Sequence, residues 1–444
     1  MTVARTICLG FLILIGIGTT LLLLPFSTAT GEWNEFVTAL FTATSAVCVT
    51  GLIVVDTGTH HSLFGEVVIL LLIQLGGLGY MTATTFLLIL LGRRFGLREK
   101  LAIQKSLDLG GLSNAVQLVK SIIALTLVFE LMGALFLYPV FSEDHGEIYG
   151  AWLAVFHSIS AFNNAGFSLF EDSLSQYATS LPINIVIPFL ILVGGLGYQV
   201  MMELFAWGRD RLRGKRVHSY FSLNFKISTS TSLFLLVLGT LALFIIEYRN
   251  SSLFGNFSLS EKLMVSWFHS VMPRTAGFNS VDYGQFTTTG LLLTIALMFI
   301  GANPGGTGGG IKTTTFRIWY SCTKSVLRSR EEVLCYQRQI PNSLIMKAVG
   351  VVFASGVTVI SVTSFIAFSD PDIDFMQVLF EVVSAFATVG LSTGITASLS
   401  ILGKLAIIVT MYVGRVGVLL LISALLGDPK PRVVTYPEEN LLVG

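Results

Sequence analysis

Charged side chains are scarce in this chain, making up 12% of its 444 residues, whereas apolar side chains make up 53%. Soluble domains carry about twice that share of charge. The composition therefore excludes an ordinary soluble protein and indicates one that lies in a lipid bilayer. The formal net charge of +1 gives no reason to expect a nucleic-acid partner.

Cysteine is rarer still, and Cys8, Cys48, Cys322 and Cys335 show no spacing typical of a disulfide framework or a metal site. Phosphate-binding loops are also missing, because no Gly-Lys-Ser/Thr follows the GGLGY segments. Intramembrane histidine pairs of the kind that hold haem are not found either. We therefore expect no enzyme activity and no cofactor, and we keep a polytopic membrane enzyme and a structural scaffold as alternatives to a transport protein.

Long apolar runs are abundant, and eight of them are long enough to cross a bilayer as helices of about 20 residues. They begin near residues 7, 64, 116, 181, 227, 288, 343 and 400. The first run lacks a small-x-small cleavage site, so we interpret it as a spanning helix and not as a cleaved signal. Between the two members of each successive pair lies an apolar stretch of about 12 residues, too short to span, which predicts a re-entrant half-helix.

These four short stretches repeat one another. They read FTATSAVCVTG, FHSISAFNNAG, FHSVMPRTAG and FEVVSAFATVG, and their final glycines, Gly51, Gly166, Gly277 and Gly390, are spaced by 115, 111 and 113 residues. A second glycine signal follows each one, at 74–80, 192–198, 303–310 and 413–417. Four copies in one order at a near-constant period indicate an internal repeat. We predict an all-α integral membrane fold with four tandem helix–pore loop–helix repeats, comprising eight spanning helices and four re-entrant half-helices around a pseudo-fourfold pore.

The repeat also predicts the domain boundaries. Repeat 1 covers residues 1–95, repeat 2 covers 112–210, repeat 3 covers 224–330 and repeat 4 covers 341–427. The C-terminal tail, 428–444, is polar and contains prolines, and we expect it to reach a neighbouring subunit.

Basic residues gather in the segments that join one repeat to the next. Of the 27 basic residues, 18 lie there: Arg93, Arg94, Arg98, Lys100, Lys105, Lys120, Arg209, Arg211, Arg213, Lys215, Arg216, Lys226, Arg317, Lys324, Arg328, Arg330, Arg338 and Lys347. The positive-inside rule places these joints and both termini in the cytoplasm. The joints are a candidate docking surface for a soluble partner, and attraction to anionic lipid headgroups explains them equally well.

The pore loops then enter from outside, where acidic residues gather. These are Glu32, Glu35, Asp56, Glu143, Asp144, Glu147, Glu171, Asp172, Asp282, Asp370, Asp372 and Asp374. An acidic mouth would concentrate cations, and a merely solvated surface is the alternative.

The loops after the half-helices are the candidate selectivity filter. A ring of backbone carbonyls can replace the water around a potassium ion, and glycine suits the narrowest point because it adopts positive φ and has no side chain. The carboxyl end of each half-helix, the negative end of its dipole, would point at the ion. The predicted filter residues are Val49, Thr50, Gly51, Asn164, Ala165, Gly166, Thr275, Ala276, Gly277, Thr388, Val389 and Gly390. For one glycine alone, a tight turn or close helix packing is the alternative.

His157 and His269 lie early in their half-helices, at a similar depth. We expect them to be packing residues, and pH sensing is the alternative.

The sixth spanning segment is interrupted at 301–315 by Pro304 and six glycines. Irregular backbone at membrane depth is tolerated only where protein or water surrounds it, so we predict a loop below the filter that acts as a gate, with a simple helix kink as the alternative. The candidate gating residues in it are Gly305, Gly306, Thr307, Gly308, Gly309, Gly310 and Lys312. Lys312 would instead extend to the cytoplasmic interface if it has no role in gating.

Arg415 lies in the middle of the apolar eighth segment, where a charged side chain needs a cavity or a partner. We predict that it faces the pore below the filter and repels cations. A structural ion pair, with Glu130 or Glu203 as partner, is the alternative.

The loop sequences VTGL, NNAGF, PRTAGFNS and TVGL, together with GGLGY, resemble those of the Trk/Ktr/HKT potassium transporter superfamily, and most closely those of its KtrB-type potassium-translocating subunit. The likeness covers nearly the whole chain. It departs at Met272, where the family pattern has threonine. The resemblance implies potassium uptake with one filter glycine per loop, potassium at Gly51, Gly166, Gly277 and Gly390, and an intramembrane gating loop that ends in Gly-Ile-Lys.

The resemblance also implies the setting in which the chain works. It implies a homodimer in the plasma or inner membrane, each protomer with its own pore, docked on a cytosolic nucleotide-binding (KtrA-like) regulatory ring, with uptake stimulated by sodium. Glycine at all four filter positions favours potassium over sodium. The sequence leaves open whether the chain is a gated channel or a sodium-coupled symporter.

Overall fold

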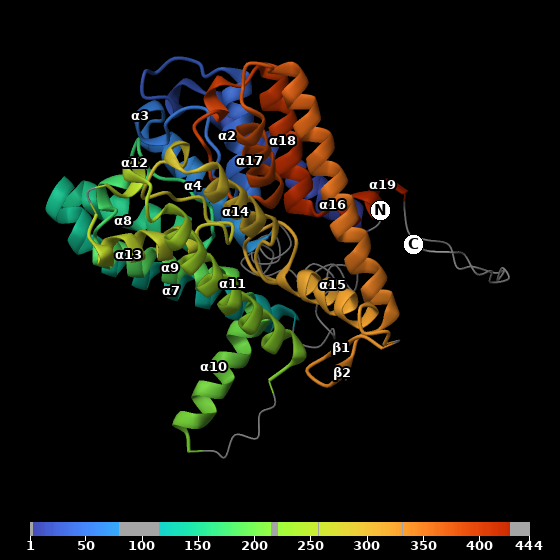
Figure 1. The fold of residues 1–444 in the computed structure, drawn as a ribbon. Coiled ribbons are helices and arrows are strands. Elements are labelled where there is room, and N and C mark those ends of the chain that lie inside the picture. The colour runs from blue at the N-terminus through green and yellow to red at the C-terminus, as the bar shows by residue number, and fades with distance from the viewer. Residues whose placement is uncertain (1–2, 80–114, 215–220, 256, 331, 427–444) are drawn as a thin grey trace.

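The computed structural model describes residues 3–79, 115–214, 221–255, 257–330 and 332–426. The chain is helical, and in the described part its single sheet is a two-stranded antiparallel hairpin of β1 (Leu334–Cys335) and β2 (Arg338–Gln339). Figure 1 shows long helices packed around shorter ones, with α10 (Tyr198–Leu212) projecting away from the rest of the molecule.

The described helices fall into four successive units, each with a long first helix followed by two shorter helices of 12 to 16 residues. The first helices of these units are α1 (Val3–Leu23), α7 (Ala115–His145), α11 (Leu223–Glu247) and α16 (Asn342–Ser369). The short helices are α2 (Phe36–Cys48), α8 (Glu147–Phe162), α13 (Leu259–Val271) and α17 (Phe375–Ala387). The helices that follow them are α4 (Leu63–Leu78), α9 (Leu181–Gly195), α14 (Thr288–Phe299) and α18 (Ile401–Val416), with single-turn helices α3 (Thr57–His60) and α12 (Ser251–Phe254) in the connections.

The short helices begin and end where local chemistry requires it. Ser258 and Glu261 form a reciprocal capping box at the start of α13, and the carboxylate of Asp374 caps α17 by accepting from the backbone N–H of Met376. At the other end, Val49 after α2 and Thr388 after α17 have positive φ, so the helical hydrogen-bond pattern cannot continue.

Several helices fit a bilayer by length and composition. Among the described residues, four helices are long and apolar enough to cross a membrane: Ala4–Leu23, Val119–His145, Leu223–Glu247 and Asn342–Ser369. Up to six spans result if each of two bent helix pairs is counted as one. The remaining apolar helices α2, α4, α14 and α17 are shorter.

Two segments that we expected to be continuous helices are bent. The helix pair α9 and α10 meets at 105°, and α18 meets α19 (Val418–Leu426) at 91°. The breaks fall at Gly197 and Gly417, both with φ +87°, a value that glycine adopts without steric penalty. The expectation that Arg415 lies in mid-helix is therefore wrong, because α18 ends one residue later, at Val416.

Glycines in α4, α9 and α18 let these helices approach the carboxyl ends of the short helices. A Cβ added to Gly76 would lie 2.1 Å from the carbonyl oxygen of Val47, and one added to Gly194 would lie 1.8 Å from that of Phe162. A Cβ added to Gly414 would likewise lie 1.9 Å from the carbonyl oxygen of Phe386. Close packing against α2, α8 and α17 therefore explains these glycines of the second signal.

Several predictions lie outside the described residues. These concern the end of repeat 1 (80–95), the basic residues Arg93, Arg94, Arg98, Lys100, Lys105, Lys215 and Arg216, and the tail 428–444. The proposed boundaries 1–95, 112–210, 224–330 and 341–427 stay predictions.

Candidate functional site

The four loops after the short helices share one backbone pattern. In each, a residue with positive φ is followed by one other residue and then by a glycine with positive φ, as in Val49 (φ +56°) and Gly51 (φ +91°). The other pairs are Asn164 with Gly166, Thr275 with Gly277, and Thr388 with Gly390. A non-glycine residue in this region costs about 1 kcal/mol or more, so its occurrence at the same place in all four loops indicates a conformation that the surrounding structure imposes.

The four glycines form a closed ring. A Cβ added to Gly51 would lie 2.4 Å from the carbonyl oxygen of Ala165, and one added to Gly166 would lie 2.8 Å from that of Ala276. A Cβ added to Gly277 would likewise lie 2.6 Å from the carbonyl oxygen of Val389.

The ring closes at Gly390, whose added Cβ would lie 2.0 Å from the carbonyl oxygen of Thr50. Each loop therefore contacts the next, and the last contacts the first. Four equivalent carbonyl oxygens, one from each loop, lie against the glycine of the neighbouring loop.

The ring is fully buried and supported from behind by hydroxyl groups. Ser45 accepts from the backbone N–H of Gly51, and Ser384 accepts from that of Gly390, both at 3.1 Å. Ser160 donates to the carbonyl oxygen of Phe167 at 2.7 Å. All twelve predicted filter residues are buried, so the arrangement is held by protein and not by solvent.

His157 and His269 take equivalent positions behind the ring. Nε2 of His157 lies 3.0 Å from the hydroxyl of Ser168, and Nε2 of His269 lies 3.2 Å from that of Ser280. Both histidines are buried, as the predicted packing role requires. In the fourth unit a buried Glu381 accepts from the hydroxyl of Thr396 instead.

On one side of the ring lies a cavity of about 280 Å³, the mouth cavity. The four ring glycines line it together with Glu171, Asp172 and Asp282. Of the twelve acidic residues predicted at the mouth, these three line this cavity in the described part of the chain. Asp370 instead stabilises the start of α18, because its carboxylate accepts from the backbone N–H and the hydroxyl of Ser400.

On the other side of the ring, the segment 301–315 lies directly against the loops. The hydroxyl of Thr307 donates to the side-chain oxygen of Asn164 at 2.8 Å, and the N–H of Gly309 donates to the hydroxyl of Thr388 at 3.0 Å. A Cβ added to Gly308 would lie 1.8 Å from the hydroxyl oxygen of Thr275. The segment therefore contacts the first residue of three of the four loops.

The ends of this segment are tied to each other and to α9. The N–H of Gly301 donates to the carbonyl oxygen of Ile311 at 2.9 Å, and the N–H of Thr307 donates to that of Gly194 at 3.3 Å. Lys312 donates to the carbonyl oxygen of Gly308 at 2.6 Å, within the same segment. The predicted alternative, a simple kink, does not describe this geometry, because the thirteen residues from Ile300 to Lys312 separate α14 from α15 (Thr313–Val326).

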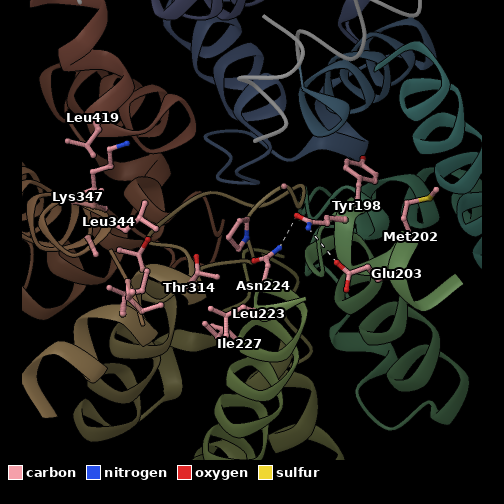
Figure 2. A pocket seen from close by; sticks show the side chains of 18 of the residues that line it. Tyr198, Met202, Glu203, Leu223, Asn224, Ile227, Thr314, Leu344, Lys347 and Leu419 are labelled. Carbon is pink, nitrogen blue, oxygen red and sulfur yellow. Dashed lines mark hydrogen bonds between the residues drawn. The ribbon is translucent and has the colours of Figure 1, made fainter. Parts of the chain in front are cut away.

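Beyond the segment lies a second, larger cavity of about 750 Å³. Figure 2 shows side chains from α10, α11, α15, α16 and α19 around it, among them Tyr198, Asn224 and Thr314. Pro304 and Gly305 line it from the segment, while Thr307, Gly308 and Gly309 contact the ring. The segment 301–315 thus separates the mouth cavity and ring from the second cavity.

Arg415 holds the segment in place. Its guanidinium donates from Nη1 to the carbonyl oxygen of Thr307 and from Nη2 to that of Gly76. The proposed ion pair with Glu130 or Glu203 is not formed: Glu130 accepts from Gln74 and Asn163, and Glu203 accepts from Gln199 and from the N–H of Ser222.

Two supporting groups were missed by sequence reasoning. The amide of Asn163 donates to both Gln74 and Glu130 at 2.9 Å, which ties the second loop to α4 and α7. Arg274 donates to the carbonyl oxygen of Ile300 at 3.0 Å, and its own carbonyl oxygen accepts from the amide of Asn164 at 3.0 Å. The arginine of the PRTAG motif and the double asparagine of NNAG are the sequence signals from which they could have been predicted.

Comparisons with known proteins show what this chain is similar to. The family model described as "TrkH: Cation transport protein" matches residues 7–432. The chain is 37% identical to Ktr system potassium uptake protein B of Bacillus subtilis, over 100% of this chain and 97% of that protein. It is 38% identical to the protein of the same name from Vibrio alginolyticus, over 99% and 94%.

A third relative is the potassium/sodium uptake protein NtpJ of Enterococcus hirae, 36% identical over 99% of this chain and 97% of that protein. Among solved structures, the potassium transporter TrkH from Vibrio parahaemolyticus matches with a TM-score of 0.74, covering 95% of this chain and 84% of that chain at 19% identity. The structural match shows a shared fold.

Proposed function

Since this chain belongs to the TrkH family of cation transport proteins, we propose that it moves potassium ions across a membrane through the ring of four glycine loops. The membrane character is plain from its several apolar helices. The relatives are transporters, and no step in this proposal needs catalysis or a cofactor.

The observation that carries the proposal is the closed ring. Thr50, Ala165, Ala276 and Val389 supply equivalent carbonyl oxygens that lie against the glycines of neighbouring loops. A cage of neutral oxygens can replace the hydration shell of a monovalent cation without adding net charge. Each cage oxygen follows the carboxyl end of a short helix, where the helix dipole favours a cation.

Potassium is the proposed ion. Two of the relatives are named for potassium uptake and one for potassium and sodium together. The choice of potassium rests on glycine at all four ring positions, which leaves the cage free of side chains, and on Glu171, Asp172 and Asp282 at the mouth cavity, which would concentrate cations there.

The segment 301–315, including Gly305, Gly306, Gly310 and Lys312, is the proposed gate. It lies between the ring and the second cavity, so an ion that leaves the ring must displace it. Arg415 fixes its middle to α4, and its guanidinium also opposes a cation beneath the ring. Release of the Thr307 contact is therefore part of the proposed opening.

The wider arrangement is part of the same proposal. We place eight spans and four half-helices in a cell membrane, with both termini in the cytoplasm. The relatives named "Ktr system potassium uptake protein B" are components of a system with further members. From the family resemblance we propose a homodimer of this chain docked on a cytosolic nucleotide-binding regulatory ring. Sodium is proposed as a stimulating or coupling ion.

The test is potassium flux into liposomes that contain the purified chain, beside the variant Gly51→Ser. A serine Cβ would lie 2.4 Å from the carbonyl oxygen of Ala165 at a φ of +91°, so the cage must deform and the preference for potassium over sodium should fall. Gly16→Ser is the matched control, because nothing lies within 4 Å of its added Cβ.

An unchanged ion preference in Gly51→Ser would show that the ring is not part of the ion pathway. Flux in the presence and absence of sodium then separates a channel from sodium-coupled transport. If the chain alone is silent, the measurement is repeated with the regulatory partner, and silence there would overturn the proposal.

A further inference from the structure

One face of α15 carries a row of polar and basic side chains. Its members are Arg317, Tyr320, Ser321, Lys324 and Ser325, and Arg328 follows two residues after the end of α15. The spacing of three, one, three and one residues places the five helical members on the same side of the helix. The row begins close to the segment 301–315, because α15 starts at Thr313.

The chain then folds back over this face. The backbone N–H groups of Arg328 and Arg330 both donate to the carbonyl oxygen of Ser325, at 3.1 and 3.0 Å, and Ser329 between them has φ +50°. The hydroxyl of Ser325 donates to the carbonyl oxygen of Glu332 at 3.1 Å, which holds the hairpin strand beside the helix. Arg330, Glu332 and Leu334 thereby form a second wall.

Between the two walls lies a cavity of about 150 Å³, the basic pocket. Its lining contains four cationic side chains, Arg317, Lys324, Arg328 and Arg330, and one carboxylate, Glu332. Among the described residues, no carboxylate lies within 4.0 Å of any of the four cations. The Nε of Arg317 is buried and has no hydrogen-bond partner.

Stabilisation of the helix end accounts for only part of this cluster. A basic residue in the last turn interacts favourably with the unpaired carbonyls there, and Lys324 is in that position. Arg317 lies nine residues before the end of α15, beyond the reach of that effect. The guanidinium of Arg317 also lies over the ring of Tyr320, 5.8 Å from its centroid, within the same lining. Four cations that line one cavity, one of them with an unpartnered buried N–H, are a donor set suited to a phosphate group.

The surroundings of the basic pocket indicate where the phosphate comes from. Val326 and Leu327, beside the pocket, are 69% and 82% exposed, and Trp319 and Tyr320 are also exposed. Apolar and aromatic side chains next to basic ones are typical of a helix that lies in the headgroup region of a bilayer. In Figure 1, α15 runs from the centre of the molecule toward the start of α16, the long helix that follows it.

We propose that the basic pocket binds the phosphate headgroup of an anionic phospholipid and thereby biases the segment 301–315. The connection is short: the N–H of Thr313 donates to the carbonyl oxygen of Ala302 at 3.3 Å, and its hydroxyl donates to the side-chain oxygen of Asn303. A ligand that bridges α15 and the hairpin stabilises the arrangement described here, in which the segment lies against the ring. The headgroup should therefore lower potassium flux, a consequence that rests on the proposed function.

The first test measures lipid binding, which does not depend on transport. Phosphatidylglycerol is titrated against the purified full chain, with R328Q/R330Q as the variant and R338Q as the matched control. Arg338 is an exposed arginine of the same hairpin that does not line the pocket. Each charge near an anionic surface contributes about fivefold in binding, so we expect R328Q/R330Q to bind about 25-fold more weakly than the unmodified chain and R338Q to lose at most about fivefold.

Equal binding by R328Q/R330Q and R338Q would overturn the proposal. A third arm adds inorganic phosphate, and complete competition without any preference for the lipid would assign the pocket to a soluble anion and overturn the lipid assignment.

The second test measures flux in phosphatidylcholine vesicles with and without phosphatidylglycerol. We expect the anionic lipid to lower potassium flux in the unmodified chain and in R338Q but not in R328Q/R330Q. The same lipid response in all three proteins would overturn the link to the gate. Absence of flux in phosphatidylcholine alone would count against the proposed function and leave the binding result standing.

Discussion

Substitution of Gly308 by alanine tests the proposed gate with a single methyl group. The added Cβ would lie 1.8 Å from the hydroxyl oxygen of Thr275, whereas ordinary contact begins at 3.4 Å, so the two must separate by about 1.6 Å. Rotation of the threonine gives no relief, because its own Cβ also lies 2.9 Å away, and the Cβ of Ala302, within the segment itself, lies 2.8 Å away.

The segment is expected to move in preference to the ring. Thr275 is fully buried within the closed ring, whereas Gly305, three residues before Gly308, is exposed. Overpacking of a buried contact costs about 1–3 kcal/mol. The part of that cost that arises from Thr275 applies to the closed arrangement alone, and a cost of this size shifts the closed-to-open equilibrium by about 5- to 150-fold, so potassium flux should rise severalfold.

The assay is potassium flux into liposomes at matched protein content, with Gly350→Ala as control. That glycine lies in α16 and has no atom within 4 Å of an added Cβ. Gly305→Ala is a second comparison inside the segment, where the strain of φ +72° is present without a clash. Unchanged flux in a folded Gly308→Ala protein would refute the gate. A lower preference for potassium over sodium would show that the ring, and not the segment, had yielded.

Three further predictions follow from contacts already described. Arg415→Gln loses the donors to Thr307 and Gly76 and should raise potassium flux in the liposome assay, with Arg415→Lys intermediate because one ammonium cannot reach both carbonyls in the fork geometry of arginine. Gly194→Ala places a Cβ 1.8 Å from the carbonyl oxygen of Phe162 and should lower the free energy of unfolding by about 1–3 kcal/mol, seen as a lower Tm than for Gly208→Ala, which meets no atom within 4 Å. Burial, with the nearby His60, lowers the pKa of His61 in the folded chain to about 4. As the pH falls below 6.5 the unfolded chain therefore binds this proton before the folded chain does, so the folded chain should lose stability between pH 6.5 and 4. If His61→Asn has the same Tm–pH slope as the unmodified chain over this range, the prediction is contradicted.

The short helices and their loops could be predicted from the sequence because their signals are local. About a dozen apolar residues that end in glycine cannot span a bilayer, and four copies at a regular period make each one more certain. The described short helices end at Cys48, Phe162, Val271 and Ala387, and each is followed by the predicted loop. The position of 301–315 against the ring was likewise expected from glycine and proline at membrane depth.

The bends and the partners could not be predicted, because they depend on distant parts of the chain. LVGGLGY reads as an uninterrupted apolar helix, yet it breaks at Gly197, where the N–H of Tyr198 donates to the carbonyl oxygen of Gly305 more than a hundred residues away. For Arg415 the alternative to a place facing the pore was an ion pair with a carboxylate, and instead two backbone carbonyls accept from it. A sequence pattern indicates that a buried charge requires partners but does not identify irregular backbone as the partner.

The second glycine signals carry a further consequence for symmetry. Aligned on Gly76, Gly194 and Gly414, the next positions hold Gly77, Gly195 and Arg415, so one repeat has a long cation where two have no side chain. An assembly of four identical subunits would bring four such arginines, and four copies of the segment 301–315, to one central axis, where they would exclude one another by charge and by volume. Joining the four repeats in a single chain allows one obstruction and one arginine to serve the whole ring. The ring can remain nearly fourfold while the part that closes it has no symmetry.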